Sequence, residues 1–166
     1  LFPPSWTRDQ SILEVLEDSI HDAVSASPTG EWLDDGLLRT LEEELKPMLG
    51  RFPKLSWENG RSVDVSEQTL PRFAALRTRT PQPQECRVVG KLEAIRHSTH
   101  AFMLVLDDGT KVRGIAAPEQ DEKLKGHWGE RVLVLGQAVF RPSMDLLRVD
   151  AREIEAAEER DDVWSF

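Results

Sequence analysis

The chain has 166 residues, of which only Cys86 is a cysteine and none is a tyrosine. A single cysteine excludes a disulfide within the chain and a zinc cluster built from several thiolates. No apolar run approaches the roughly 18 residues that a membrane-spanning helix needs. The first residues, LFPPSW, lack the basic and apolar regions of a signal peptide. We therefore predict no membrane insertion and a cytoplasmic setting.

Basic residues are scarce in relation to acidic ones, and the net charge is -9. Residues 1–86 carry 9 Lys/Arg against 15 Asp/Glu, residues 87–150 carry 10 against 9, and residues 151–166 carry 2 against 6. A protein whose main task is to bind phosphates is usually basic over a large part of its length. Only residues 87–150 are not acidic overall, and their net charge is only +1.

Enzyme motifs are missing as well. There is no Gly-rich phosphate loop and no G-x-S-x-G setting for a nucleophilic serine. The paired acids at 34–35, 107–108 and 161–162 fall in expected turns or in the tail, where solvated acids are common. Cys86 is expected to be inert. We predict a non-catalytic protein that holds no cofactor.

Residues 1–80 predict a helical region. The segment TRDQSILEVLEDSIHDAV places apolar residues three and four apart, which is typical of an amphipathic helix with one buried stripe: Ile12, Leu13, Leu16, Ile20 and Val24. Thr7 and Gln10 have the spacing of a capping box at its start. A second helix is expected in WLDDGLLRTLEEELKPML, with these side chains facing inward: Leu37, Leu38, Leu41, Leu45 and Met48. Pro47 should end or kink that helix because it lacks a backbone donor.

A hairpin and a connector follow the two helices. The segment KLSWENGRSVDV alternates apolar residues around Asn59-Gly60, which predicts a small β-hairpin near residues 54–65. The segment RTRTPQPQE is rich in proline and polar residues, so residues 81–86 are expected to be a linker.

After this linker the pattern changes to strands, expected at 86–96, 101–106, 110–116, 130–140 and 146–154. The segment PEQDEKLKGHWG, between the third and fourth strands, is long enough for a short helix. The first strand, VVGKLEAIR, contains Gly90 in its middle, and the fourth, GERVLVLGQAVF, has the pattern G-x-x-V-x-V-x-G. This order and these motifs resemble the OB-fold superfamily, a five-stranded barrel.

The resemblance covers roughly residues 86–155. It implies an α+β chain in which a helical N-terminal region with a small β-hairpin precedes a five-stranded OB-like β-barrel. Residues 156–166 then form an acidic tail. Because this barrel serves many unrelated binding tasks, the resemblance implies a fold and not a function.

The segment FMLVLDDGTKVRG, residues 102–114, allows two hairpin registers. A two-residue loop would pair Leu104 with Arg113, whereas a three-residue Asp-Asp-Gly loop would pair Leu104 with Val112. Only the second register brings the large apolar side chains at 102, 104 and 106 into a common core with Val112. Each such burial contributes roughly 1.5–3 kcal/mol. We predict the three-residue loop, with Met103 and Val105 on the outside.

In OB-folds the usual ligand face spans the second and third strands and the loops beside them. The resemblance therefore implies these binding-face residues: Arg96, His97, His100, Met103, Val105, Lys111, Arg113 and Arg141. The cations favour a phosphate-tracking surface, but no aromatic side chain is expected there for bases to stack on. Apolar Met103 and Val105 beside charges are typical of a protein contact. Either the N-terminal helices or a second protein is expected to cover them.

His97 and His100 have a spacing found among metal ligands. The sequence shows no third ligand near them apart from His127, so we predict no metal site.

The tail EIEAAEERDDVWSF is acidic and ends in Trp164 and Phe166. An OB-fold followed by an acidic tail that closes on an aromatic residue is similar to bacterial single-strand-binding proteins. That similarity implies that Trp164 and Phe166 dock a partner protein. The tail departs from the pattern because it lacks the long spacer and the proline before the last phenylalanine.

Together these observations predict a non-catalytic adaptor or accessory subunit that binds a partner protein. The net charge of -9 favours a basic partner. The alternative is a single-stranded nucleic-acid-binding protein that uses the basic residues of the barrel face.

Overall fold

Two units are distinguished in the computed structural model, which describes residues 11–58, 62–158 and 164–165. One unit is Leu1–Pro81 with Arg141–Asp145, and the other is Gln82–Phe140 with Leu146–Phe166. The described part contains four helices, a two-stranded antiparallel sheet and a closed five-stranded barrel, so the predicted α+β class is confirmed. Among these helices, none is long and apolar enough to cross a membrane.

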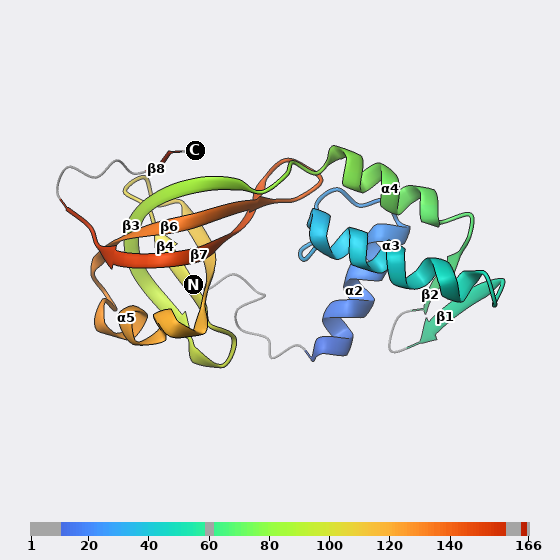
Figure 1. Cartoon of the computed structure of the whole chain (residues 1–166), viewed down its shortest axis with the longest axis horizontal. Helices are drawn as coiled ribbons and strands as arrows, with labels where there is room; N and C mark the ends of the chain where they lie inside the picture. Colours follow the sequence, from blue (N-terminus) through green and yellow to red (C-terminus); the bar gives the residue numbers. More distant parts are fainter. Residues whose placement is uncertain (1–10, 59–61, 159–163, 166) are drawn as a thin grey trace. The chain divides into compact units, whose positions relative to one another are not determined.

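The first unit is built from three helices and a hairpin (Figure 1): α2 (Ile12–Val24), α3 (Asp35–Leu49), β1 (Lys54–Glu58), β2 (Ser62–Ser66) and α4 (Leu70–Arg79). The strands pair Leu55 with Val65 and Trp57 with Val63, which confirms the predicted hairpin, while its Asn59-Gly60 turn lies outside the described residues. The core of this unit is apolar: Ile20, Ala23, Leu33, Leu38, Leu41, Leu45, Leu49, Val63, Val65, Phe73 and Leu76.

The N-terminal cap of α2 and the buried face of α3 can be compared with the predicted helices. The capping box of α2 is formed by Ser11 and Glu14, each of which accepts the backbone N–H of the other, at 3.2 Å and 2.8 Å. The predicted box at residues 7–10 lies outside the described residues. In α3, Met48 is exposed and not buried as predicted, because the four-residue step from Leu45 places Leu49 on the inner stripe.

The second unit is the barrel, made of β3 (Gln84–Arg96), β4 (Ala101–Val105), β5 (Lys111–Ala116), β6 (Arg131–Phe140) and β7 (Leu146–Ala156). Each strand is paired on both sides in the closed order β3-β4-β5-β7-β6, and only the β5–β7 pair is parallel. Figure 1 shows β3 curving around the barrel. This closed mixed barrel is compatible with the predicted OB-like barrel.

Shorter elements complete the barrel unit: η1 (His97–Thr99), η2 (Pro118–Gln120), α5 (Asp121–Gly126) and β8 (Trp164–Ser165). The helix α5 stands between β5 and β6, where the sequence predicted a short helix. The barrel core is formed by inward residues of all five strands, by Leu106 directly after β4 and by one residue of α5: Cys86, Val88, Leu92, Phe102, Leu104, Leu106, Val112, Ala116, Leu124, Val132, Val134, Ala138, Val149, Ala151 and Ile154.

The β4–β5 hairpin has the predicted three-residue loop. Leu104 pairs with Val112, and the Leu106 N–H donates to the Thr110 carbonyl at 2.9 Å. Gly109 has φ +83°, the left-handed conformation that the loop requires and that glycine adopts without strain. The register therefore sends alternate residues of β4 into the core and the others to the outside.

Candidate functional site

The outward residues of β3, β4 and β5 form three rows across the strands. The rows are Lys91–Val105–Lys111, Ala94–Met103–Arg113 and Arg96–Ala101–Ile115. We call these nine residues the barrel outer face. Five of the predicted binding-face residues lie on it: Arg96, Met103, Val105, Lys111 and Arg113.

The centre of the barrel outer face is apolar and its edges carry cations. Met103 was expected on this outer face, covered either by the N-terminal helices or by a second protein; only 1% of it is exposed, although it does not belong to the barrel core. Arg113 is its direct cross-strand neighbour, and an arginine lays its methylene stem along adjacent apolar surface. Ile115, which is 42% exposed, is the open large apolar side chain of this face.

Lys91 shares this face, although it was not among the predicted binding-face residues. The reason is a β-bulge between Leu92 and Ala94, which leaves Glu93 as the extra residue. A bulge places two residues opposite one and shifts the alternation of the strand. Counting back in twos from Arg96 would put Leu92 outside, whereas Leu92 is fully buried in the core.

Arg141 does not join the barrel outer face. It begins the segment Arg141–Asp145 between β6 and β7, which belongs to the helical unit. Its backbone N–H donates to the Asp145 carbonyl at 2.9 Å, and the Ser143 N–H donates to the Pro28 carbonyl at 2.9 Å.

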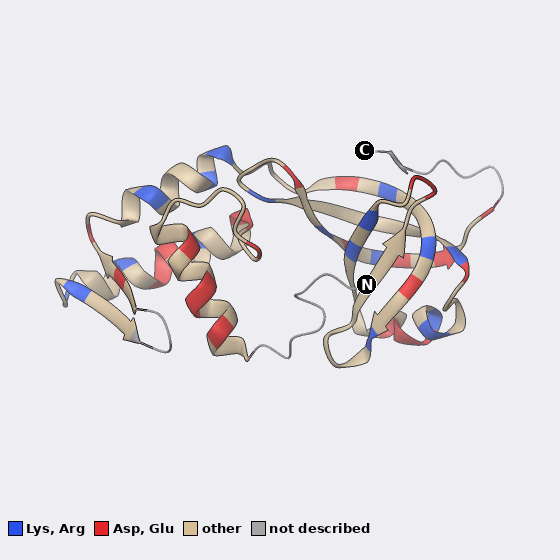
Figure 2. Ribbon diagram, turned by 180° about the vertical axis from the view of Figure 1, so that it is seen from behind, with Lys and Arg blue, Asp and Glu red and all other residues tan. Residues whose placement is uncertain are grey.

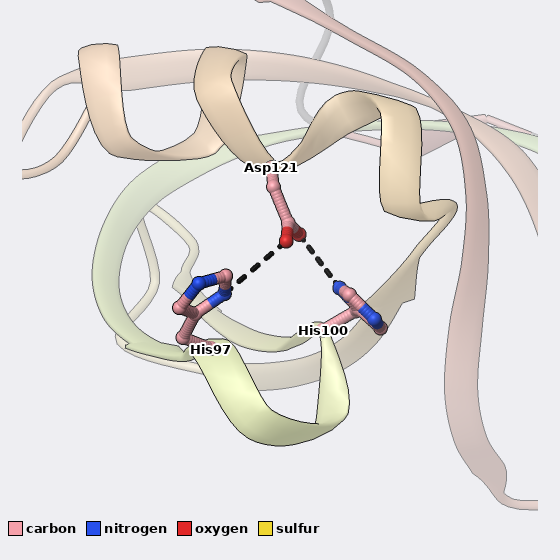
Figure 3. A group of neighbouring side chains, drawn as sticks. All are labelled: His97, His100 and Asp121. Carbon is pink, nitrogen blue, oxygen red and sulfur yellow. Dashed lines mark hydrogen bonds and ion pairs between the residues drawn. The ribbon is translucent and has the colours of Figure 1, made fainter.

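His97 and His100 come together with a third residue, Asp121, that was not predicted from the sequence. The Nδ1 atom of His97 lies 3.2 Å from Oδ2 of Asp121, and Nδ1 of His100 lies 2.8 Å from Oδ1 (Figure 3). One carboxylate therefore contacts both imidazoles. We call these three residues the His–His–Asp cluster.

The backbone explains how the two histidines converge. His97 begins η1, and His100 directly follows it in the left-handed region with φ 53°. The His100 carbonyl accepts the Ala116 N–H at 2.9 Å, which ties the turn to the end of β5. Asp121 is the first residue of α5, so the docking of that helix brings the carboxylate to the turn.

The cluster is partly open to solvent. The side chains of His97, His100 and Asp121 are 70%, 34% and 15% exposed. The hydrogen bond with His100, helped by the charges of both histidines when protonated, lowers the pKa of Asp121, so its carboxylate is ionised at neutral pH. The other histidine considered as a partner, His127, instead contacts Glu130 at 2.9 Å.

A second feature lies on α2. The stripe that the sequence predicts to be buried throughout is covered only in its second half, where Ile20 is buried and Val24 is half-buried. In its first half Ile12 is 88% exposed, Leu13 is 65% exposed and Leu16 is 36% exposed. We call these three residues the α2 patch. Sequence periodicity could not locate it, because a period shows that a face is apolar and not what lies against it.

Acidic residues surround the α2 patch. The helix carries Glu14, Glu17, Asp18 and Asp22 and no lysine or arginine. In Figure 2, the ribbon of α2 accordingly shows acidic positions only.

Of the two tail residues predicted to dock a partner, only Trp164 lies among the described residues. Trp164 belongs to β8, whose backbone pairs with β3 through Trp164–Val88 and Ser165–Arg87. Phe166 lies outside the described residues.

Comparison with known protein families gives no matching family model, and no curated protein matches the chain.

Proposed function

We propose that the chain is a non-catalytic adaptor that binds a partner protein through the α2 patch, and that its barrel is of the OB-like type. The observation that carries the proposal is the division of a single apolar stripe into a buried half and an exposed half. Ile20 is 2% exposed, whereas Ile12, two turns earlier on the same stripe, is 88% exposed. Helices of this kind bind by placing the exposed face against an apolar groove or a second helix.

The energetics of the α2 patch favour a protein partner. Full burial of each large apolar side chain contributes roughly 1.5–3 kcal/mol, so three of them can anchor an interface core. The acidic residues around them favour a partner with lysine or arginine at its rim, because complementary charge steers association. A basic amphipathic segment is therefore the expected occupant.

The test is affinity capture from an extract of the source cells, followed by binding measurements with the purified partner. The triple variant Ile12→Ser, Leu13→Ser, Leu16→Ser should lose the partner that the wild-type chain retains. Variant Glu17→Gln, Asp18→Asn should bind more slowly, and its association rate should depend less on salt.

A matched control is available in the same unit. Met48 and Phe52 are 44% and 55% exposed and lie off the α2 patch. The double variant Met48→Ser, Phe52→Ser should bind as the wild type does. Equal retention of the partner by the triple variant and by this control would contradict the proposal.

Single-stranded nucleic acid is the second candidate, favoured by one observation. The barrel outer face holds four cations on the two strands that flank β4: Lys91 and Arg96 on β3, and Lys111 and Arg113 on β5. Against it, none of the nine residues of that face is aromatic, and stacking is a main source of affinity for single strands. A gel shift at low salt distinguishes the two. Binding that disappears in Lys111→Glu, Arg113→Glu but survives in the α2 triple variant would favour nucleic acid.

A further inference from the structure

We propose that His97, His100 and Asp121 bind one divalent transition-metal ion, with zinc as the ion that this donor set fits best. The three side chains come from two elements, the turn η1 and the helix α5. Each can offer one donor atom, and these atoms all lie within 4.8 Å of one another. This site lies in the barrel unit and is independent of the α2 patch.

The distances agree with a shared ion. Zinc binds histidine nitrogen at about 2.0–2.1 Å and carboxylate oxygen at about 2.0–2.2 Å, so neighbouring donors of a tetrahedral site stand about 3.3 Å apart. In the cluster, Nδ1 of His97 lies 3.2 Å from Oδ2 of Asp121 and Nδ1 of His100 lies 2.8 Å from Oδ1, and one donor atom from each of the three residues lies within 4.8 Å of the other two. The 2.8 Å separation is shorter than this tetrahedral spacing, so binding of the ion requires the His100 imidazole to move away from the carboxylate.

The chemistry of the donors selects the class of ion. Two imidazole nitrogens and one carboxylate suit zinc and its neighbours, whereas Mg²⁺ and Ca²⁺ prefer sites made entirely of oxygen. Without metal, the carboxylate of Asp121 accepts a hydrogen bond from the Nδ1–H of His100 and lies 3.2 Å from Nδ1 of His97. With metal bound, each Nδ1 lone pair faces the ion and the imidazole proton resides on Nε2, so each neutral imidazole keeps one proton.

The arrangement leaves room for a further ligand. Three protein donors occupy three positions of a tetrahedron, and the fourth is open to water or to a group from another molecule. The exposure of His97, at 70%, gives solvent access to the site. A bound ion would also tie the β3–β4 turn to α5, two segments that are 21 residues apart at His100 and Asp121.

The experiment is metal titration of the purified chain after treatment with a chelator. Isothermal calorimetry should show one Zn²⁺ per chain, and Co²⁺ should give the visible absorption of a tetrahedral site. Removing a residue that only hydrogen-bonds to a metal ligand lowers metal affinity by about 10–100-fold. His97→Ala and Asp121→Asn remove a ligand itself, so each should lower the affinity for Zn²⁺ by more than about 100-fold. His127→Ala is the control and should bind as the wild type does.

The ions themselves provide a second comparison, because this kind of site should rank Zn²⁺ above Fe²⁺, with Mg²⁺ far weaker. Failure of the wild type to take up one Zn²⁺ per chain overturns the proposal, as does equal affinity of His97→Ala and His127→Ala. Preference for Fe²⁺ or Mg²⁺ overturns the assignment of zinc. Circular dichroism checks the fold of each variant. If Asp121→Asn does not fold, His97→Ala decides, since that side chain is largely exposed.

Discussion

The ring of Phe102 lies directly over Gly114, its cross-strand partner in the β4–β5 hairpin. A Cβ atom at position 114 would stand 2.0 Å from Cζ of the ring, far inside van der Waals contact. The glycine therefore creates the space in which the largest side chain of β4 enters the barrel core. Phe102 is fully buried there.

Replacing Gly114 with alanine should destabilise the barrel, because the ring has to leave its position or the strands have to separate. Overpacking of this kind costs about 1–3 kcal/mol in the free energy of unfolding. Urea unfolding followed by circular dichroism measures the change. Gly126→Ala is the control, since a Cβ at Gly126 meets nothing within 4 Å. Equal stability of the two variants would show that the ring does not occupy that space.

Substitutions in the buried half of the α2 stripe should lower the free energy of unfolding, whereas substitutions in its exposed half should change it little. Ile20→Ala should lower the free energy of unfolding by about 2–5 kcal/mol, because it opens a cavity in the helical core. Ile12→Ala should stay within about 0.5 kcal/mol, because the side chain is exposed. The same denaturation experiment compares them, and a large loss for Ile12→Ala would mean that the α2 patch is already covered.

The single cysteine should react slowly with thiol reagents. Burial, with a smaller contribution from the charge of Glu85, raises the pKa of the Cys86 thiol from 9.0 to about 11. A raised pKa keeps the thiol protonated, so at pH 8 the thiolate population is roughly 100-fold smaller than for an ordinary cysteine. Reaction with a chromogenic disulfide should be slow in buffer, increase up to about pH 11, and be fast in urea. Rapid reaction of the folded chain at pH 8 would contradict this environment for Cys86.

Asp64 should titrate below an ordinary aspartate. The hydrogen bond from Lys54, whose Nζ lies 2.7 Å from the carboxylate, lowers its pKa, and a hydrogen bond from Ser56 at 2.7 Å adds to this. Because the folded-state pKa is lowered, the stabilisation is present above the pKa of the unfolded chain and is lost as pH falls through the folded value. NMR titration should show the pKa of Asp64 rising in Lys54→Met and staying unchanged in Lys46→Met.

The strands of the barrel could be predicted from sequence because their information is local. The predicted strand 86–96 is observed as Gln84–Arg96, and 130–140 is observed as Arg131–Phe140. The register of the β4–β5 hairpin followed from burial alone, since a slip of one residue would have turned every inward side chain of β4 to solvent. The bulge at Glu93 was not predicted, because the alternation of apolar and polar residues within a strand does not show where an extra residue is inserted.

In the candidate sites, too, features that depend on neighbouring residues could be predicted from the sequence, and features that depend on distant residues could not. The sequence by itself determined that His97 and His100 share one short turn and that one face of α2 is apolar, since both depend on residues close together in the chain. Only the tertiary structure decided that Asp121 completes the His–His–Asp cluster and that half of the α2 stripe remains exposed. Both outcomes depend on how separate elements dock, and docking is set by packing between residues far apart in the chain. A periodic pattern records which face is apolar, but the element that lies against that face is chosen by the fold.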